Sequence, residues 1–313
     1  MPRYLVTGCA GFVGSHLSET LLERKHEVVG IDAFTDYYAR RLKEANLERA
    51  RARPGFTFVE RNLADGELAP LFEGVDGVFH LAAQPGVRGS WGATFAIYVR
   101  ENILATQRLF EAAARARVRV VMASSSSVYG NAEEYPTRED TSPRPVSPYG
   151  VSKLACESLA QTYSECFGLE VVALRYFTVY GPRQRPDMAF SRIISALLGG
   201  ESFRVFGTGE QSRDFTYVGD AVAATVAAMN GRRGSAVYNV GGGSETSLGE
   251  VVALCERLAG RRLELRHEPA AAGDVRRTAA DTARIRAELG WTPQTALEEG
   301  LTAQLAAARS TAA

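Results

Sequence analysis

A tyrosine and a lysine stand four residues apart in the segment SPYGVSK, as Tyr149 and Lys153. In a helix this spacing places both side chains on one face. A phenol has an unperturbed pKa of about 10, so it needs a nearby cation to act as a base near neutral pH. Lys153 can supply that charge, and the pair therefore predicts removal of a proton from a substrate hydroxyl. Taken alone, the same spacing also occurs on solvated helix faces.

Four consecutive serines, Ser124 to Ser127, open the segment SSSSVYG ahead of this pair. A serine hydroxyl donates and accepts hydrogen bonds, but it is no general acid or base near neutral pH. The segment therefore predicts a wall that binds a polar or anionic group without exchanging protons with it. The alternative is that some of these hydroxyls only satisfy backbone groups at a strand end.

A glycine-rich turn in YLVTGCAGFVGSHL places Gly8, Gly11 and Gly14 between a predicted strand and a predicted helix. Such a turn lets the backbone approach a pyrophosphate, and the helix N-terminus adds free N–H groups. Asp32 follows Gly14 by 18 residues, at the end of the apolar run EVVGID. A carboxylate there accepts hydrogen bonds from the adenosine ribose and repels a 2′-phosphate. These features predict NAD rather than NADP, although the glycines alone would also fit an ordinary tight turn.

The elements that must position these residues alternate between short apolar runs and segments of helical period. The predicted strands are Tyr4–Thr7, Val28–Ile31, Phe56–Val59, Gly77–His80, Val118–Ala123, Val171–Leu174 and Val237–Val240. The predicted helices include Gly14–Arg24, Phe95–Arg115, Ser147–Phe167 and Asp220–Met229. Apolar strands separated by helices predict an α/β fold with a Rossmann-type, doubly wound parallel sheet.

After about Tyr176 the pattern loosens into loops rich in Gly, Pro and Arg, and ends in two further helical patterns and a polar tail, ARSTAA. We expect a smaller α/β substrate-binding lobe over the carboxyl ends of the strands, where open α/β sheets bind ligands. The expected division is residues 1–175 with 215–243 for the NAD-binding Rossmann domain, and 176–214 with 244–313 for the nucleotide-sugar-binding lobe.

Composition narrows the function classes. The 36 basic and 36 acidic residues cancel, so net charge indicates no nucleic acid or membrane partner. Four scattered cysteines without a CxxC pair favour reduced thiols, and we expect no metal site. The first residues run directly into a strand pattern, and no apolar run approaches the roughly 20 residues that span a bilayer. A soluble, cytoplasmic enzyme is expected.

Six motifs together resemble the extended branch of the short-chain dehydrogenase/reductase superfamily, in particular its nucleotide-sugar epimerases: TGCAGFVGSHL, HLAAQPGVR, SSSSVYG, SPYGVSK, RYFTVYGP and RDFTYV. The resemblance implies Tyr149 as the base, Lys153 as its tuner and nicotinamide-ribose ligand, and Ser125 as the partner of the sugar O4. It also implies a set of NAD contacts: Gly8, Gly11, Phe12, Val13, Gly14, Asp32, Asn62, Leu63, Leu81, Ala82, Ala83, Asn102, Tyr149, Lys153 and Tyr176.

Enzymes of this kind share hydride transfer from sugar C4 to NAD⁺ and differ in their later steps. The 4,6-dehydratases that resemble this chain carry an Asp-Glu pair after the catalytic hydroxyl, and UDP-glucuronate decarboxylases carry a Glu in that stretch. Ser126 and Ser127 occupy those positions here. The resemblance therefore favours epimerisation, in which no acid or base acts at C5 or C6.

Three segments resemble UDP-glucuronate 4-epimerases more closely than UDP-glucose 4-epimerases: HLAAQPGVR, GIDAFTDYY and TVYGPRQRPDMAF. The last carries Arg183 and Arg185, and a guanidinium there could clamp a carboxylate bidentately. We expect Arg185 to do so, with Thr178, Ser126 and Ser127 as further donors, although loop arginines are often merely solvent-exposed. The remaining substrate contacts implied by the resemblance are Arg213 and Arg276 at the diphosphate, Asp274 at the uridine ribose, and Arg88.

Some positions depart from the family pattern. Asn62 stands where an Asp usually contacts adenine, and Pro85 and Gly89 alter the loop near Arg88. His80 fits a structural role better than a catalytic one. Open alternatives are a neutral-sugar 4-epimerase, a UDP-glucuronate decarboxylase, an NAD-dependent dehydrogenase or reductase, and a catalytically silent NAD-binding regulator. The helices Phe95–Arg115 and Ser147–Phe167 resemble those of the family's dimer interface, which implies a homodimer.

Overall fold

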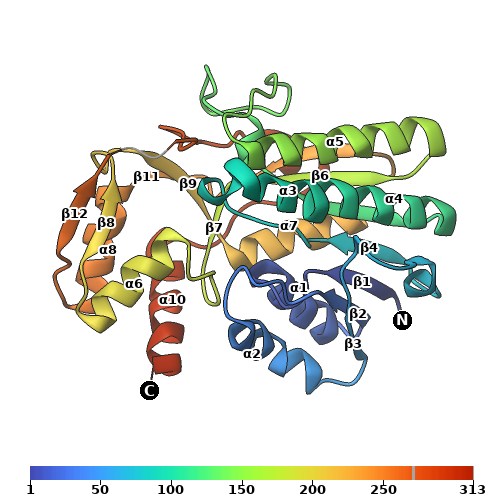
Figure 1. The fold of residues 1–313 in the computed structure, drawn as a ribbon, viewed down its shortest axis with the longest axis horizontal. Coiled ribbons are helices and arrows are strands. Elements are labelled where there is room, and N and C mark those ends of the chain that lie inside the picture. Colours follow the sequence, from blue (N-terminus) through green and yellow to red (C-terminus); the bar gives the residue numbers. More distant parts are fainter. Residues whose placement is uncertain (270–271, 313) are drawn as a thin grey trace.

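The computed structural model describes residues 1–269 and 272–312. Its centre is a seven-stranded, fully parallel sheet in the order β10-β6-β5-β4-β1-β2-β3 (Figure 1). The strands of this sheet are β1 Arg3–Thr7, β2 Glu27–Asp32, β3 Phe56–Glu60, β4 Gly77–His80, β5 Arg119–Ser125, β6 Val171–Tyr176 and β10 Ala236–Val240. The predicted Rossmann-type fold class is confirmed.

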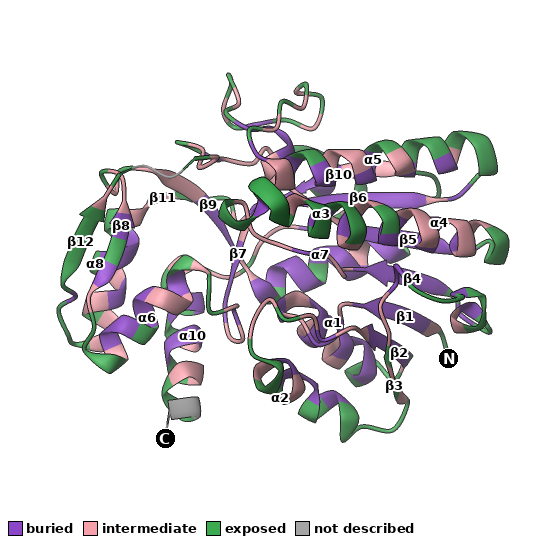
Figure 2. Ribbon diagram, viewed as in Figure 1, coloured by how far each residue is buried: buried purple, intermediate pink, exposed green. Residues whose placement is uncertain are grey.

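Helices cover both faces of this sheet, and successive strand residues pack in opposite directions. Leu5 of β1 packs in the core under α4 and α5, whereas Val6 packs in the core under α1, α2 and α7. These helices are α1 Phe12–Glu23, α2 Arg40–Arg51, α3 Phe95–Tyr98, α4 Ala105–Ala116, α5 Pro148–Phe167 and α7 Val218–Asn230. A π-helical turn, Val99–Leu104, joins α3 to α4. Figure 2 shows buried residues concentrated in the sheet between these layers.

A smaller lobe extends from the carboxyl ends of the strands. It contains a three-stranded mixed sheet, β11-β9-β7, and a parallel pair, β12-β8. The strands of this lobe are β7 Thr178–Tyr180, β8 Phe203–Phe206, β9 Ser212–Tyr217, β11 Glu245–Ser247 and β12 Leu265–Glu268. The helices not yet named are α6 Ala189–Gly199, α8 Leu248–Ala259, α9 Ala283–Leu289 and α10 Leu297–Ala312. A separate apolar core, which includes Phe190, Phe215 and Val251, holds α6, α8 and the lobe's strands together.

Two expectations for the second half of the chain were wrong. The stretch after Tyr176, expected as loops, keeps a loop between β7 and α6 but also contains β7, α6, β8 and β9. Its short strands pair with partners distant in sequence, which a local pattern does not reveal. The segment expected as a polar tail is helical through Ala312. In the described part of the chain, no helix is long and apolar enough to cross a bilayer.

The strand order reverses between β1 and β4, which start the two halves of the sheet. In open α/β sheets, ligands bind in the crevice at such a switch point, outside the carboxyl ends of the strands. Gly8 follows β1 and Leu81 follows β4 at this edge. The fold therefore places the glycine-rich turn where a ligand is expected.

Candidate active site

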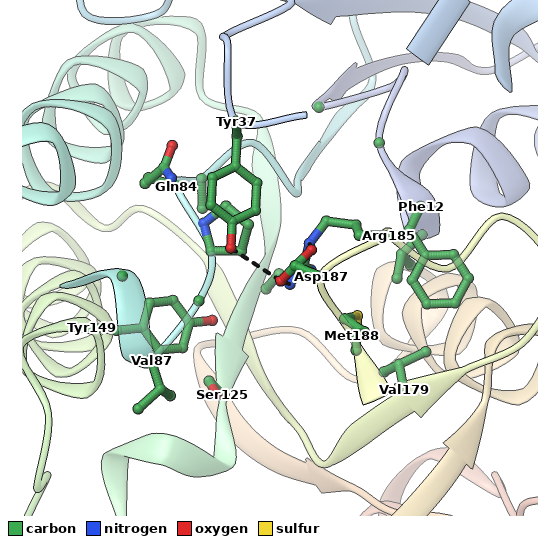
Figure 3. A pocket seen from close by; sticks show the side chains of 18 of the residues that line it. Phe12, Tyr37, Gln84, Val87, Ser125, Tyr149, Val179, Arg185, Asp187 and Met188 are labelled. Atoms are coloured by element: carbon green, nitrogen blue, oxygen red, sulfur yellow. Dashed lines mark hydrogen bonds and ion pairs between the residues drawn. The ribbon is translucent and has the colours of Figure 1, made fainter. Parts of the chain in front are cut away.

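A cavity of about 900 Å³ opens along this edge and continues into the smaller lobe. Its walls come from the turn after β1, the loop after β4, the end of β5, the start of α5 and the loop between β7 and α6. Figure 3 shows Tyr149 and Ser125 on one side of this space, with Arg185 and Asp187 facing them. Residues from both parts of the fold thus meet in one site.

The glycine-rich turn has the geometry that a dinucleotide requires. Gly8 has φ +69°, which disfavours other residues, and a Cβ on Gly14 would collide with the carbonyl oxygen of Gly8. Gly11 caps the N-terminus of α1, whose first turn carries no acidic residue and lines the cavity. Close backbone approach and unpaired helix N–H groups therefore fit the pyrophosphate of NAD.

Asp32 at the end of β2 lies beside this turn and lines the cavity. Its carboxylate accepts hydrogen bonds from the backbone N–H of Ala10 at 3.1 Å and of Phe34 at 2.9 Å. Burial raises the pKa of Asp32, while these N–H groups and the nearby Lys43 favour the charged form. A fixed, partly neutralised carboxylate in this position fits the hydroxyls of the adenosine ribose.

Tyr149 and Lys153 lie on the first turns of α5 and both line the cavity. The helix starts there because the hydroxyl of Ser147 accepts the N–H of Gly150 at 3.1 Å and Pro148 occupies the first helical position. Lys153 Nζ donates to the carbonyl oxygen of Ala123 at 2.9 Å. This contact ties the catalytic helix to the end of β5, where the serines begin.

The four serines divide into two roles. Ser124 also borders the cavity, but its hydroxyl donates to Glu157, which forms a buried ion pair with Arg175 at 2.7 Å. Ser125 Oγ accepts the N–H of Ser127 at 3.2 Å and caps a short 3₁₀ turn, Ser126–Val128. Ser125, Ser126 and Ser127 all line the cavity. One serine therefore serves the interior, and three form the predicted wall.

Arg185 reaches the cavity as predicted, but its guanidinium is already paired. Nε and Nη2 donate to the two carboxylate oxygens of Asp187 at 2.9 and 3.0 Å. The Tyr37 hydroxyl donates to the same carboxylate at 3.0 Å (Figure 3). Asp187 therefore occupies the bidentate face that was expected to clamp a substrate carboxylate, and Arg185 keeps Nη1 for another partner.

Arg183 has a different environment from Arg185. Its backbone has φ +65°, and its guanidinium pairs with Glu19 at 2.8 Å and donates to Ser15 at 3.3 Å, both on α1. This contact fastens the loop to the first helix.

Three further arginines converge on the part of the cavity in the smaller lobe. Arg88, Arg192 and Arg204 line it, and burial together with the charges of Arg204 and Arg88 lowers the pKa of Arg192. Arg88 stacks over Phe206 at 4.0 Å and pairs with Asp274 at 2.6 Å. A cationic cluster beside an aromatic ring suits a nucleotide diphosphate and its base. Sequence analysis did not single out Arg192 or Arg204.

Most of the predicted site residues meet in this one cavity. Those that line it are Gly8, Gly11, Phe12, Val13, Gly14, Asp32, Asn62, Leu63, Leu81, Ala82, Ala83, Arg88, Ser125, Ser126, Ser127, Tyr149, Lys153, Tyr176, Thr178, Arg185 and Asp274. Asn102, Arg213 and Arg276 are not among the residues that line it.

Each of these three has a different environment. Asn102 is buried and holds the backbone of Gln84 through its amide, with Oδ1 accepting at 2.7 Å. Arg213 donates to the carbonyl oxygens of Ser212 and Val275, at 2.8 and 2.7 Å, and Arg276 is exposed. The predicted roles of these three residues as cofactor and substrate ligands therefore stay predictions.

The carboxylates of the cavity wall are all engaged. Among the described lining residues these are Asp32, Glu101, Asp187 and Asp274. Asp32 accepts backbone N–H groups, and the other three accept from Asn62, Arg185 and Arg88, respectively. Each of these carboxylates is therefore held by a donor of the protein, and the serine segment at the end of β5 contributes no carboxylate of its own. The described residues contain no cluster of His, Cys, Asp and Glu that could hold a metal.

His80 lies below the cavity, fully buried at the end of β4. Its ring nitrogens contact Thr7 Oγ1 at 2.8 Å and Thr106 Oγ1 at 2.9 Å. Burial and the charge of Lys153 lower its pKa to about 3, so the ring stays neutral. These contacts fit the structural role expected for His80.

The sheet order and the Tyr149–Lys153 pair are those of an extended short-chain dehydrogenase/reductase. Within that class, the chain belongs to the family described as GDP-mannose 4,6 dehydratase, which matches residues 5–304. The chain is 46% identical over 308 residues to a protein of Bacillus subtilis (strain 168) named "Uncharacterized UDP-glucose epimerase YtcB", covering 97% of both chains.

Two solved structures show the same fold. UDP-glucuronic acid 4-epimerase from Bacillus cereus, in complex with UDP-glucuronic acid and NAD, superposes with a TM-score of 0.96 at 39% identity and 99% coverage of both chains. MoeE5, solved with UDP-glucuronic acid and NAD, gives a TM-score of 0.90 at 45% identity, again with 99% coverage of both chains.

These comparisons confirm the predicted class of enzyme, an NAD-dependent nucleotide-sugar 4-epimerase, and NAD as its cofactor. They do not distinguish UDP-glucuronate from UDP-glucose as the substrate. The relatives divide between UDP-glucuronate and UDP-glucose epimerases at comparable identity, and MoeE5 was solved with either nucleotide sugar.

Proposed function

We propose that this chain interconverts UDP-glucuronate and UDP-galacturonate by epimerisation at C4. The observation that carries the proposal is the wall formed by Ser125, Ser126 and Ser127 beside Tyr149 and Lys153. This wall offers hydroxyl donors to a sugar carboxylate and carries no carboxylate of its own. The site is thus built to bind C6 and to do chemistry at C4.

In this mechanism Tyr149 takes the proton of the C4 hydroxyl, with Ser125 bonded to the same oxygen. Lys153, one helical turn after Tyr149 on α5, lines the same cavity and donates to the carbonyl oxygen of Ala123. NAD, when bound, accepts the hydride from C4 and returns it to the opposite face of the sugar. The sugar has to turn between these steps, so the nucleotide must stay anchored, and Arg88, Arg192 and Arg204 supply the cations for that task.

Oxidation of a uronate at C4 creates a β-keto acid, which readily loses CO₂. Contacts from Ser126, Ser127, Thr178 and Arg185 to the carboxylate would hold its C–C bond near the plane of the ketone and suppress that loss. Because Asp187 occupies one face of Arg185, we expect Nη1 to make the substrate contact.

Deuterium at C4 tests the route. UDP-[4-²H]glucuronate, turned over without added NAD or reductant, is expected to give UDP-galacturonate that keeps the label at C4 and gains no solvent hydrogen at C5. Loss of the C4 label would mean that the hydride is not returned directly and would contradict the route. Exchange at C5 in D₂O would mean that a base acts there and would contradict the proposed roles of Ser126 and Ser127.

A second candidate is UDP-glucose 4-epimerisation, and the Arg185–Asp187 pair favours it. An ion pair offers both a donor and an acceptor to a 6-hydroxyl, and it presents no unbalanced positive charge to attract a carboxylate. Turnover of each sugar nucleotide by itself therefore decides between the two candidates.

We also propose that the chain forms a homodimer. Four exposed apolar side chains lie on the segments expected to form the dimer interface and are between 43% and 64% accessible: Ile97 of α3, Leu104 at the end of the π-helical turn, and Val151 and Phe167 of α5. A second copy of this chain packed on these segments would cover them.

Two further expectations remain predictions. They are the division into residues 1–175 with 215–243 and 176–214 with 244–313, and a cytoplasmic location.

A further inference from the structure

Asn62 and Glu101 face each other at the end of the cavity beyond Asp32. The backbone N–H of Arg61 donates to the carbonyl oxygen of Asp32 at 3.0 Å, so the residues after β3 lie next to the ribose carboxylate. Asn62, Leu63 and Glu101 line this end of the cavity. Its position next to the ribose site makes it the place for the adenine ring.

A local irregularity of the helix brings Glu101 there. The residue lies in the π-helical turn Val99–Leu104, which inserts an extra residue between α3 and α4. Asn102, the next residue, is buried and bonded to Gln84 and Ser152. Glu101 points instead into the cavity with a side chain that is 13% exposed.

The hydrogen bonds define what this pair can offer a ligand. Asn62 Oδ1 accepts the N–H of Ala64 at 2.8 Å, so the amide NH₂ is its free end. Asn62 Nδ2 lies 3.0 Å from each oxygen of Glu101, so one of its N–H groups is shared between the two oxygens. The second N–H of the Asn62 amide is left for a ligand. The Glu101 carboxylate also accepts from Arg100, yet a carboxylate has about four acceptor sites. The pair thus presents one donor and one strong acceptor.

We propose that Glu101 is the residue that recognises the adenine of NAD. Adenine offers an N6 amino donor next to the N1 acceptor, which complements a carboxylate next to an amide N–H. In this arrangement Glu101 accepts from N6 and Asn62 donates to N1. Asn62 Oδ1 already accepts the N–H of Ala64, so the charge-bearing Glu101 side chain offers N6 the stronger acceptor. Hypoxanthine, with an O6 acceptor and an N1–H donor, is mismatched at both positions.

This proposal also accounts for the asparagine at position 62. An aspartate there would bring two carboxylates within the 3.0 Å that now separates Asn62 Nδ2 from Glu101, and like charges that close cannot both be ionised without cost. In this proposal the acceptor for N6 lies at position 101, and a neutral amide at position 62 avoids a second carboxylate beside it.

The test compares NAD with nicotinamide hypoxanthine dinucleotide, which differs only in the base. Both are titrated by calorimetry into cofactor-free protein without a sugar nucleotide, so the outcome is independent of the proposed epimerase specificity. The wild-type protein should prefer NAD by about tenfold or more. Glu101→Gln should bind NAD roughly 10- to 100-fold more weakly, the range for a lost charged hydrogen bond, and should lose most of the preference.

Three matched variants make the test specific. Asp65→Asn removes the outer partner of Arg100, whose Nη2 donates to it at 2.6 Å, and should leave the preference unchanged. Asn62→Asp should weaken NAD binding, and Asn62→Asp combined with Glu101→Gln should restore it. Wild-type affinity and preference in Glu101→Gln would overturn the proposal. If that variant fails to fold, wild-type NAD affinity in Asn62→Asp overturns it equally.

Discussion

Replacing Glu157 by Gln tests whether the buried ion pair behind the serine wall holds that wall in place. The side chains of Glu157 and Arg175 are 7% and 6% exposed, and three N–H···O contacts of 2.7 to 3.3 Å join them. Ser124 at the end of β5 donates to the same carboxylate. Gln keeps the size of Glu but leaves a buried guanidinium without its counter-charge.

Removing one partner of a buried pair typically costs about 3–5 kcal/mol. Arg175 Nη1 keeps two other acceptors, the Tyr129 hydroxyl at 2.7 Å and the carbonyl oxygen of Glu139 at 3.1 Å, so the lower end of that range applies. About 3 kcal/mol corresponds to a fall in melting temperature of roughly 6 °C or more for a large domain. We expect kcat to fall as well, because Ser125 follows Ser124, whose hydroxyl donates to the altered side chain.

Thermal unfolding followed by circular dichroism measures the effect. Glu133→Gln is the matched control, since its ion pair with Arg144 is 82% and 73% exposed and should shift the melting temperature by less than about 2 °C. Glu157→Leu combined with Arg175→Met should recover much of the loss. A melting temperature for Glu157→Gln within about 2 °C of the wild type would refute the argument that this pair anchors the wall.

Four further predictions concern charge and assembly. Asp187→Asn removes a charge that competes for Arg185. At a separation of about 6 Å and an effective dielectric of 20–80, repulsion between the Asp187 charge and a substrate carboxylate costs roughly 1–3 kcal/mol. Because the Asp187 side chain is 40% exposed, we expect the lower end of this range, which is about a fivefold lower KM for UDP-glucuronate, with no change for UDP-glucose. An equal change for both sugars would argue against the competition. Arg185→Ala should raise that KM and release a decarboxylated UDP-pentose, visible by mass spectrometry. His80 has a folded pKa of about 3 against an unfolded value near 6.5, so its stabilising contribution is present above pH 6.5 and is lost as pH falls toward 3. His80→Gln should therefore remove about 2 kcal/mol of the stability lost between pH 7 and 5 in urea titrations, and an unchanged pH slope would exclude this role. Val151→Glu should convert the proposed homodimer to monomer in light scattering, and a dimer that persists would place the interface elsewhere.

Local sequence patterns were sufficient for the parts of the site that are local in sequence. Gly8, Asp32 and the Tyr149–Lys153 pair lie at strand or helix ends that apolar periodicity locates within a residue or two. Helix α2 was not singled out, because the segment RRLKEANLERAR carries only a thin apolar stripe, in which Leu47 and Ala50 are buried.

The sequence did not predict which side chains the site residues contact, although these contacts determine what each residue can bind. Arg185 was expected in the site, but its pairing with Asp187 depends on the path of the loop, which also turns Arg183 toward α1. The Asn62–Glu101 contact joins residues 39 positions apart through a π-helical turn that no periodicity marks. Such pairings are set by tertiary packing, so a motif identifies the residue but not its partner.

Proton NMR of the purified protein with UDP-glucuronate, and separately with UDP-glucose, tests the proposed uronate specificity most directly. No reductant is added, so only a reaction that regenerates NAD in each cycle can proceed catalytically. We predict the signals of UDP-galacturonate from the first substrate and little or no UDP-galactose from the second. Efficient turnover of UDP-glucose with none of UDP-glucuronate would contradict the proposed function, as would a UDP-pentose as the main product.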